Sequence, residues 1–255
     1  MMMQTPTISY LLETELEWLI YQLWSKNTAR APTFSFKLAE TVILREGCPQ
    51  TWYFSSKEGY ILRKNQCNVR LAKINKRFIQ KNGMTVNCQD DMPAAMTYSY
   101  RPQRNTETGD ERMSLKMGYL AGKDLLKSMK VYSQVKEDRP QIVQMFQSPK
   151  LIKNSVVKVQ WSLSSMKMTK ITNKLPIFEQ RYSLSTRAVT VEDADEGLFT
   201  DQQDLPNSGM VYDRILTALV EIHNHIKKNA EISVTSGTFY FKADDFEKPV
   251  LMLAT

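Results

Sequence analysis

The 255-residue sequence predicts an α+β fold in which a mostly antiparallel sheet is packed by amphipathic helices. Two observations lead to this prediction. Strand-like segments follow one another in pairs along the chain instead of alternating with helices, which favours antiparallel over parallel pairing. Helix-like segments carry apolar residues at three- and four-residue spacing, so each presents one face that must pack on another element.

The first segment, residues 1–86, is predicted to contain an N-terminal helix, a β-rich region and a basic helix. Four leucines recur at helical spacing between residues 8 and 26, which predicts the first helix. Apolar residues alternate with polar ones from residue 34. The runs Trp52-Tyr53-Phe54 and Tyr60-Ile61-Leu62 on either side of residues 55–59 are typical of a hairpin. The basic helix is expected over about residues 68–80.

Residues 87–116 lack apolar periodicity. They contain an acidic pair, two prolines and a stretch rich in Gln, Asn, Thr and charged residues. This composition predicts a mobile loop or linker. The chain would then divide into two lobes at this point.

Residues 117–255 are predicted to form an α+β lobe with the order helix, strand, strand, helix, strand, strand, strand. Helical spacing places the first element at 123–135, and alternation places the next two at 157–163 and 181–185. An acidic loop is expected at 192–204, where six acids and no base occur.

The last four elements begin with a strongly amphipathic helix at 211–228. Asp213 lies in its first turn and two lysines lie in its last, as the helix dipole favours. A hairpin is expected around the dipeptide Ser236-Gly237, with apolar residues alternating on either side. The final strand is expected at 250–253.

The sequence shows no recognisable catalytic or cofactor-binding motif. Its nine glycines are about half the usual share, and none belongs to a GxGxxG or GxxxxGK[ST] turn that could cradle phosphates. No GxSxG nucleophile turn is present either. We therefore expect no cofactor, and a non-catalytic function is favoured over an enzyme of an unrecognised family.

Histidine and cysteine do not form a metal-binding pattern. His223 and His225 stand two residues apart on a predicted helix, so they cannot share a ligand; we expect His223 to be structural and no metal to bind. The chain has an odd number of cysteines, and the three are widely spaced, at Cys48, Cys67 and Cys88. The N-terminal residues show no secretory pattern. These features predict buried or half-buried free thiols in a reducing, intracellular compartment. No apolar stretch is long enough for a transmembrane segment.

A basic run dominates the charge distribution of the chain. It contains seven basic residues and no acid, which equals the formal net charge of +7 for the whole sequence. Its members are Arg63, Lys64, Arg70, Lys73, Lys76, Arg77 and Lys81.

The helical part of this run is expected to separate its charges from its apolar residues. Arg70, Lys73, Arg77 and Lys81 follow the spacing of one helix face, with Lys76 to the side, so they should form an outward row. A neighbouring apolar stripe, expected to anchor the helix, consists of Leu71, Ile74 and Phe78.

Such a row predicts a negatively charged partner. The favoured partner is an acidic protein surface, and the specific case we expect is a cytoskeletal filament such as a microtubule. The protein would then be a scaffold subunit in the cytoplasm or cytoskeleton. Non-sequence-specific nucleic-acid binding, with a nuclear location, is the alternative; it ranks lower because no nucleic-acid-reading module is found and the nearby aromatics are expected in the core. An anionic membrane, a solvated face and contact with the chain's own acidic segment remain open.

Overall fold

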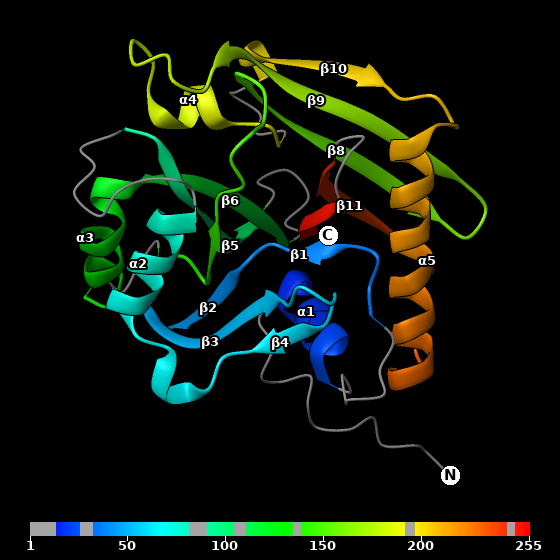
Figure 1. Cartoon of the computed structure of the whole chain (residues 1–255), viewed down its shortest axis with the longest axis horizontal. Helices are drawn as coiled ribbons and strands as arrows, with labels where there is room; N and C mark the ends of the chain where they lie inside the picture. The colour runs from blue at the N-terminus through cyan, green and yellow to red at the C-terminus, as the bar shows by residue number, and fades with distance from the viewer. Residues whose placement is uncertain are drawn as a thin grey trace.

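The structure is a computed structural model that describes residues 14–25, 33–81, 91–104, 111–134, 139–191, 197–243 and 248–255. Within these residues five α-helices and two six-stranded, mostly antiparallel sheets confirm the predicted α+β fold (Figure 1). No described helix is both long enough and apolar enough to cross a membrane.

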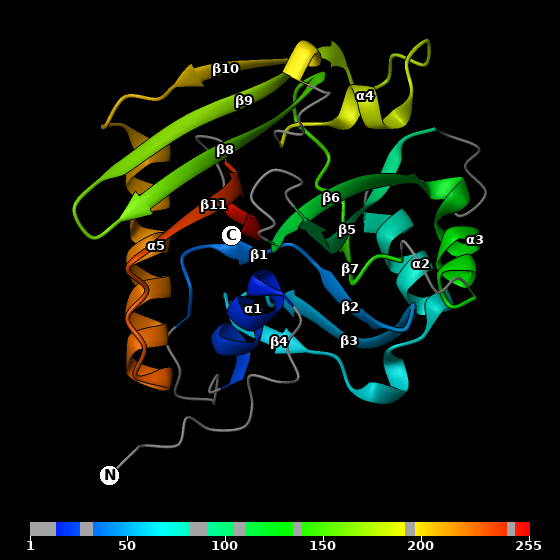
Figure 2. The ribbon, with the colours of Figure 1, turned by 180° about the vertical axis from the view of Figure 1, so that it is seen from behind.

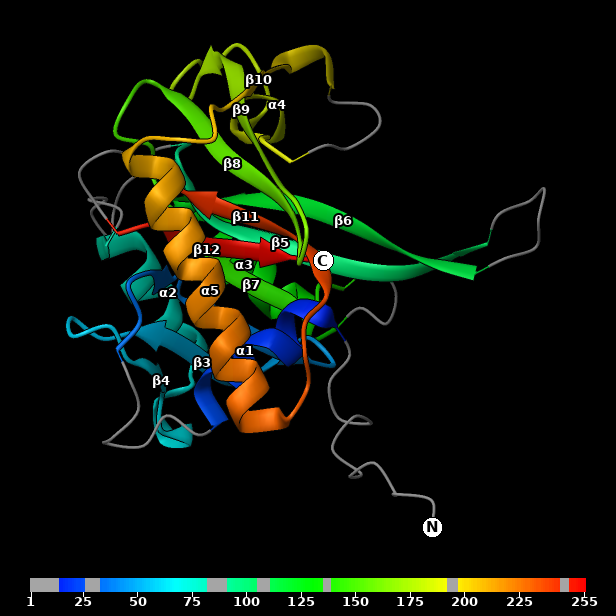
Figure 3. The same cartoon turned by 90° about the vertical axis from the view of Figure 1, so that its right-hand side faces the viewer.

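Sheet A has the strand order β1–β12–β11–β8–β9–β10, and only the β1–β12 pair within it is parallel. Helix α5 (Met210–Ala230) crosses in front of β11 and β12 in Figure 3, and its buried residues join theirs in the main core. The strands of sheet A are β1 (Lys37–Leu38), β8 (Lys153–Ser162), β9 (Met166–Pro176), β10 (Thr200–Asp204), β11 (Ser236–Lys242) and β12 (Val250–Ala254).

Sheet B has the strand order β4–β3–β2–β7–β5–β6 and is antiparallel throughout. Helices α2 (Leu71–Lys81) and α3 (Gly122–Tyr132) lie on the opposite side of the molecule from α5 (Figure 2). The strands of sheet B are β2 (Thr41–Arg45), β3 (Cys48–Ser55), β4 (Ile61–Arg63), β5 (Pro93–Arg104), β6 (Glu111–Ala121) and β7 (Ile142–Met145).

Sheet B is covered on both faces, and this explains why β2 has four consecutive buried residues. Val42 and Leu44 pack in a cluster with α2 and α3. Ile43 points the other way, into the main core that sheet A, α1 (Glu15–Ser25) and α5 also build. The α2–α3 side is therefore a separate, smaller core.

The predicted linker at 87–116 is wrong for most of its length. Residues 93–104 and 111–116 belong to β5 and β6, which form a long hairpin that extends away from the body in Figure 3. Pairing of β5 with both β6 and β7 stabilises these strands, so they need no continuous apolar pattern. Residues 87–90 and 105–110 lie outside the described residues.

The two predicted lobes share one hydrophobic core. Phe36 from the first segment, Met96 from β5 and Phe241 from the last segment pack in the same cluster. Strand β1 also pairs with β12, which joins the beginning of the described chain to its end. The sheets therefore do not follow the predicted lobe boundaries.

Three further predictions in the C-terminal part are wrong. Residues 181–185 are not a strand, because Ser183 caps the short helix α4 (Leu184–Ala188) by accepting a hydrogen bond from the Thr186 backbone at 3.1 Å. Residues 200–204 form the edge strand β10 instead of a loop. Ser236-Gly237 lies within β11 and is not a turn.

The remaining element predictions are confirmed with small shifts. The hairpin across 55–59 is the β3–β4 pair, and the helices expected at 123–135 and 211–228 are α3 and α5. The N-terminal helix is confirmed from residue 15; residues 8–13 lie outside the described part.

Candidate functional site

The predicted basic helix exists and is held by its apolar stripe. Ile74 and Phe78 on α2 are fully buried, and Leu71 is half-buried. The Phe78 ring packs edge-on against Trp52 of β3, with ring centroids 6.2 Å apart. We give the name basic surface to the exposed residues Lys73 and Lys76 of α2 together with Arg63, Lys64 and Arg70 of the segment before the helix.

Two members of the basic surface rest on aromatic rings. The Arg63 guanidinium carbon lies 4.0 Å from the ring centroid of Trp24 on α1, and the Lys64 ammonium lies 4.4 Å from that of Phe54. Each such cation–π contact contributes about 0.5–1 kcal/mol where it is exposed. The Trp24 contact was missed by sequence reasoning, since nothing in the sequence places α1 beneath β4.

The Arg77 side chain is 49% exposed, as the expected outward row requires, but its charge is paired with a carboxylate. Its Nε and Nη2 donate to one oxygen of the Glu40 carboxylate, at 3.0 and 2.7 Å, and this hydrogen bonding raises the pKa of Arg77. The Glu40 side chain is only 3% exposed. Arg77 therefore neutralises a buried carboxylate just before β2. The side chain of Lys81, the last residue of α2, lies outside the described part.

Replacing Arg77 by glutamine is expected to lower the free energy of unfolding by roughly 1–3 kcal/mol, because a buried carboxylate loses a charged hydrogen-bond partner. Arg77→Lys should recover part of the loss, since it keeps the charge but not the forked geometry. Urea unfolding measures both. Lys76→Gln, at an exposed position one residue away, should stay within about 0.5 kcal/mol. Equal losses for Lys76→Gln and Arg77→Gln would contradict the structural role of Arg77.

The side chains of Arg70, Lys73 and Lys76 are exposed. Among the described residues no carboxylate pairs with Arg70, Lys73 or Lys76, and the Lys73 ammonium donates to the side chain of Asn68. The described acids of the predicted acidic segment are engaged elsewhere: Asp204 and Asp201 pair with lysines of β9 at 3.0 and 3.6 Å. These two acids therefore do not pair with the basic surface. The acids at residues 192–196 lie outside the described part.

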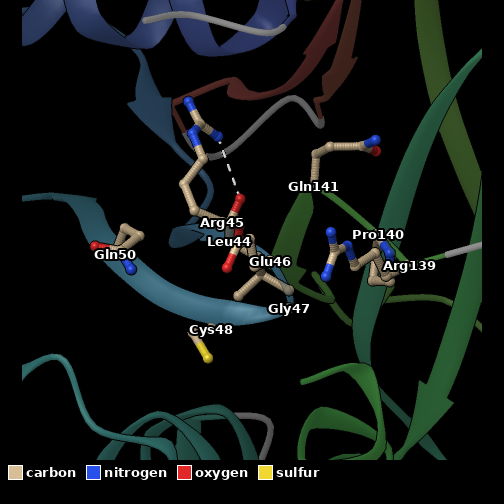
Figure 4. A pocket seen from close by; sticks show the side chains of 9 residues that line it. All are labelled: Leu44, Arg45, Glu46, Gly47, Cys48, Gln50, Arg139, Pro140 and Gln141. Carbon is tan, nitrogen blue, oxygen red and sulfur yellow. Dashed lines mark hydrogen bonds between the residues drawn. The ribbon is translucent and has the colours of Figure 1, made fainter. Parts of the chain in front are cut away.

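A pocket of about 570 Å³ lies where β2 turns into β3 (Figure 4). Glu46 and Gly47 form a tight turn with φ of 51° and 74°; a Cβ on Gly47 would come 2.0 Å from the carbonyl oxygen of Tyr132. The pocket is lined by Leu44, Arg45, Glu46, Gly47, Cys48, Gln50, Arg139, Pro140 and Gln141.

Two polar side chains of this pocket already have partners. Arg45 pairs with Glu17 of α1 and donates to the Leu44 carbonyl, and Gln141 exchanges hydrogen bonds with the Tyr100 backbone. Cys48 is exposed here, as is Cys67 elsewhere, so the expectation of buried thiols is wrong for both, and Cys88 is not described. No histidine belongs to the described lining, so a histidine-activated thiol is not built at this pocket.

Both histidines of α5 are engaged in packing. His223 lies 3.2 Å from the Val234 carbonyl oxygen through Nδ1 and packs on Trp161, with ring centroids 5.7 Å apart. His225 is the more buried of the two, contacts the Gln22 carbonyl at 3.2 Å, and burial lowers its pKa. No group of three or more potential metal ligands occurs among the described residues.

Comparison with known proteins adds no family. The sequence matches no protein-family model and no curated protein. Among solved structures, the chain is similar to macrocyclase MdnC bound with precursor peptide MdnA from Microcystis aeruginosa MRC, with a TM-score of 0.39 and 9% identity. The match covers 93% of this chain and spans half the length of the macrocyclase chain; a similarity of this size supports no argument on function.

Proposed function

We propose that this protein is a non-catalytic interaction subunit that binds an acidic protein surface through its basic surface. The observation that carries the proposal is the two-sided arrangement of α2. Ile74 and Phe78 fasten one side of the helix to sheet B. The exposed Lys73 and Lys76, and Arg70 directly before the helix, have no carboxylate partner among the described residues. A cationic row on a fixed helix attracts an acidic surface over a long range and orients it.

A protein partner fits this surface better than single-stranded nucleic acid. Proteins that bind such strands stack successive bases on exposed aromatic rings. The rings nearest the basic cations are the half-buried Trp24 and Phe54, which Arg63 and Lys64 already contact. Trp52 is only 3% exposed, and Tyr53 is buried as well. Bases would have to displace these cations or enter the core to stack on the rings. In its specific form, the proposal is that the protein is a cytoplasmic or cytoskeletal scaffold that binds an acidic filament such as a microtubule.

Replacing Arg70, Lys73 and Lys76 together by glutamine is expected to weaken binding to microtubules at least tenfold while leaving the fold intact. Removing three exposed charges takes away the electrostatic attraction that salt screens, so the remaining binding should depend less on salt. Co-sedimentation with purified microtubules at several salt concentrations measures both effects. The matched control replaces exposed lysines Lys153, Lys227 and Lys228 on other elements, with the same change in net charge.

An unchanged salt dependence in the α2 variant would overturn the proposal. Equal weakening by the control variant would also contradict it, because net charge would then matter and position would not. A parallel measurement with a 30-base-pair DNA duplex tests the alternative. Preferential binding to the duplex, lost in the α2 variant, would favour nucleic acid over an acidic protein.

A further inference from the structure

A second pocket, of about 460 Å³, lies between the start of α1, the C-terminal part of α5, the start of β11 and the end of β12. Small-molecule sites in proteins typically have volumes of roughly 300–1,000 Å³ and are mostly apolar, with a few polar groups that orient the ligand. This pocket has both properties. Its apolar lining consists of Trp18, Leu19, Ile226, Val234, Phe239 and Ala254.

The walls of this pocket are held in place by the fold. Thr14 accepts a hydrogen bond from the Glu17 backbone at 3.0 Å, which fixes the start of α1. The backbones of Thr238 and Thr255 exchange hydrogen bonds at 2.7 and 2.9 Å, which join β11 to the end of β12. Three of the lining side chains are at most 4% exposed and belong to the main core, namely Leu19, Ile226 and Phe239. The pocket is therefore formed by packed secondary-structure elements.

Glu15 is the one charged side chain in the lining that the structure describes. It is exposed, and no base pairs with it within the described part of the chain. Residues 1–13, which precede the pocket in the sequence, lie outside that part; Glu13 is the one charged side chain in their sequence, and it is also an acid. The lining therefore supplies a negative charge without a positive side chain to balance it.

An aromatic ring accompanies this carboxylate. Trp18 lies three residues after Glu15 on α1, and its half-buried side chain lines the same pocket. Residues three apart on a helix are neighbours on its surface, so an ammonium group beside the Glu15 carboxylate can also contact the indole ring, which attracts cations more strongly than Tyr or Phe. Burial raises the pKa of Tyr100 on β5, and the negative charge of Glu15 raises it further. The charge of Glu15 therefore acts on the protein interior as well as on solvent.

We propose that this pocket binds an organic ammonium ion, a small molecule with an apolar body and one positively charged amine. The apolar body lies among Leu19, Ile226 and Phe239, and the ammonium group lies between Glu15 and Trp18. A charge-assisted hydrogen bond and a cation–π contact then act on the same group, whereas a neutral molecule uses neither and an anion is repelled. The pocket shares no lining residue with the basic surface, so this proposal does not depend on the proposed function.

Isothermal titration calorimetry of the full chain with three indole probes tests the proposal. Tryptamine carries an ammonium group, tryptophol a hydroxyl in its place, and indole-3-propionate a carboxylate. Tryptamine should bind about tenfold more tightly than tryptophol, and indole-3-propionate should bind more weakly than either. Equal Kd values for tryptamine and tryptophol, or no binding of tryptamine, would overturn the proposal. Binding that appears only after residues 1–12 are removed would make the chain's own N-terminal segment the occupant and would overturn it too.

Variants place the binding in this pocket. Glu15→Gln should weaken tryptamine binding about tenfold and leave tryptophol binding unchanged, whereas Asp213→Asn, which removes an exposed acid from the first turn of α5, should change neither. Ser236→Trp, at an exposed lining position, should fill the pocket and abolish binding of both probes. Thr235→Trp, at the exposed neighbouring position outside the lining, should keep it. An unchanged preference for tryptamine in Glu15→Gln, or full binding by Ser236→Trp, would overturn the proposal.

Discussion

Replacing Phe78 by alanine is expected to lower the free energy of unfolding by roughly 3–5 kcal/mol, as for other fully buried aromatic residues. Phe78 is 0% exposed and fills the space between α2 and sheet B, next to Val42, Leu44 and Trp52. Its loss leaves a cavity that the paired strands cannot close, since β2 is hydrogen-bonded on both sides. Urea unfolding followed by tryptophan fluorescence measures the change.

The same variant links the fold to the proposed binding surface. Because Phe78 fastens the helix that presents Arg70, Lys73 and Lys76, Phe78→Ala should also weaken microtubule binding. Phe78→Leu retains much of the buried volume and should cost about half as much stability, with binding largely kept. Full stability of Phe78→Ala would show that α2 is not anchored as the structure describes.

Replacing Lys242 by methionine is expected to stabilise the protein at pH 7, by less than the full desolvation of the charge because the buried Asn154 oxygen loses its donor, and to remove a pH dependence. Burial lowers the pKa of Lys242 to about 7, against an ordinary value of 10.5. One pKa unit corresponds to about 1.4 kcal/mol. A methionine of similar length has no charge to desolvate beside Asn154 and Phe146.

The sign of the pH effect follows from proton binding. Between pH 7 and 10.5 the unfolded chain holds a proton on Lys242 that the folded chain largely lacks. Stability therefore rises as the pH rises through this range, by up to about 1.4 kcal/mol per unit from this group. Urea unfolding of wild type and Lys242→Met at pH 7, 8 and 9 isolates the contribution as a difference. Parallel pH profiles of the two proteins would show that Lys242 is not buried in a way that affects its charge.

Elements with one buried face were predictable from the sequence. The spacing of apolar residues in α5, and the aromatic runs around the β3–β4 turn, follow directly from the periodicity of a helix and a strand against a single core. The anchoring of α2 by Ile74 and Phe78 was predictable for the same reason. The sequence analysis did not predict strands β5 and β9. Each is hydrogen-bonded to a neighbouring strand on both sides, and backbone hydrogen bonds of this kind do not require a regular pattern of side chains.

The sequence by itself determined the α+β class, the excess of charge between Arg63 and Lys81 and the apolar side of α2, since each depends on residues close together in the chain. Tertiary structure alone decided which groups those charges contact. Arg77, although 49% exposed, pairs with Glu40, 37 residues away, and Arg63 lies on Trp24. It also brought Lys242 to Asn154, 88 residues away, and Arg187 to Asp91, 96 residues away. One member of the pairs made by Arg77, Lys242 and Arg187 is buried in each case, namely Glu40, Asn154 and Arg187. Because a buried polar group has no water to bind, its partner is whichever polar group the packed sheets place beside it.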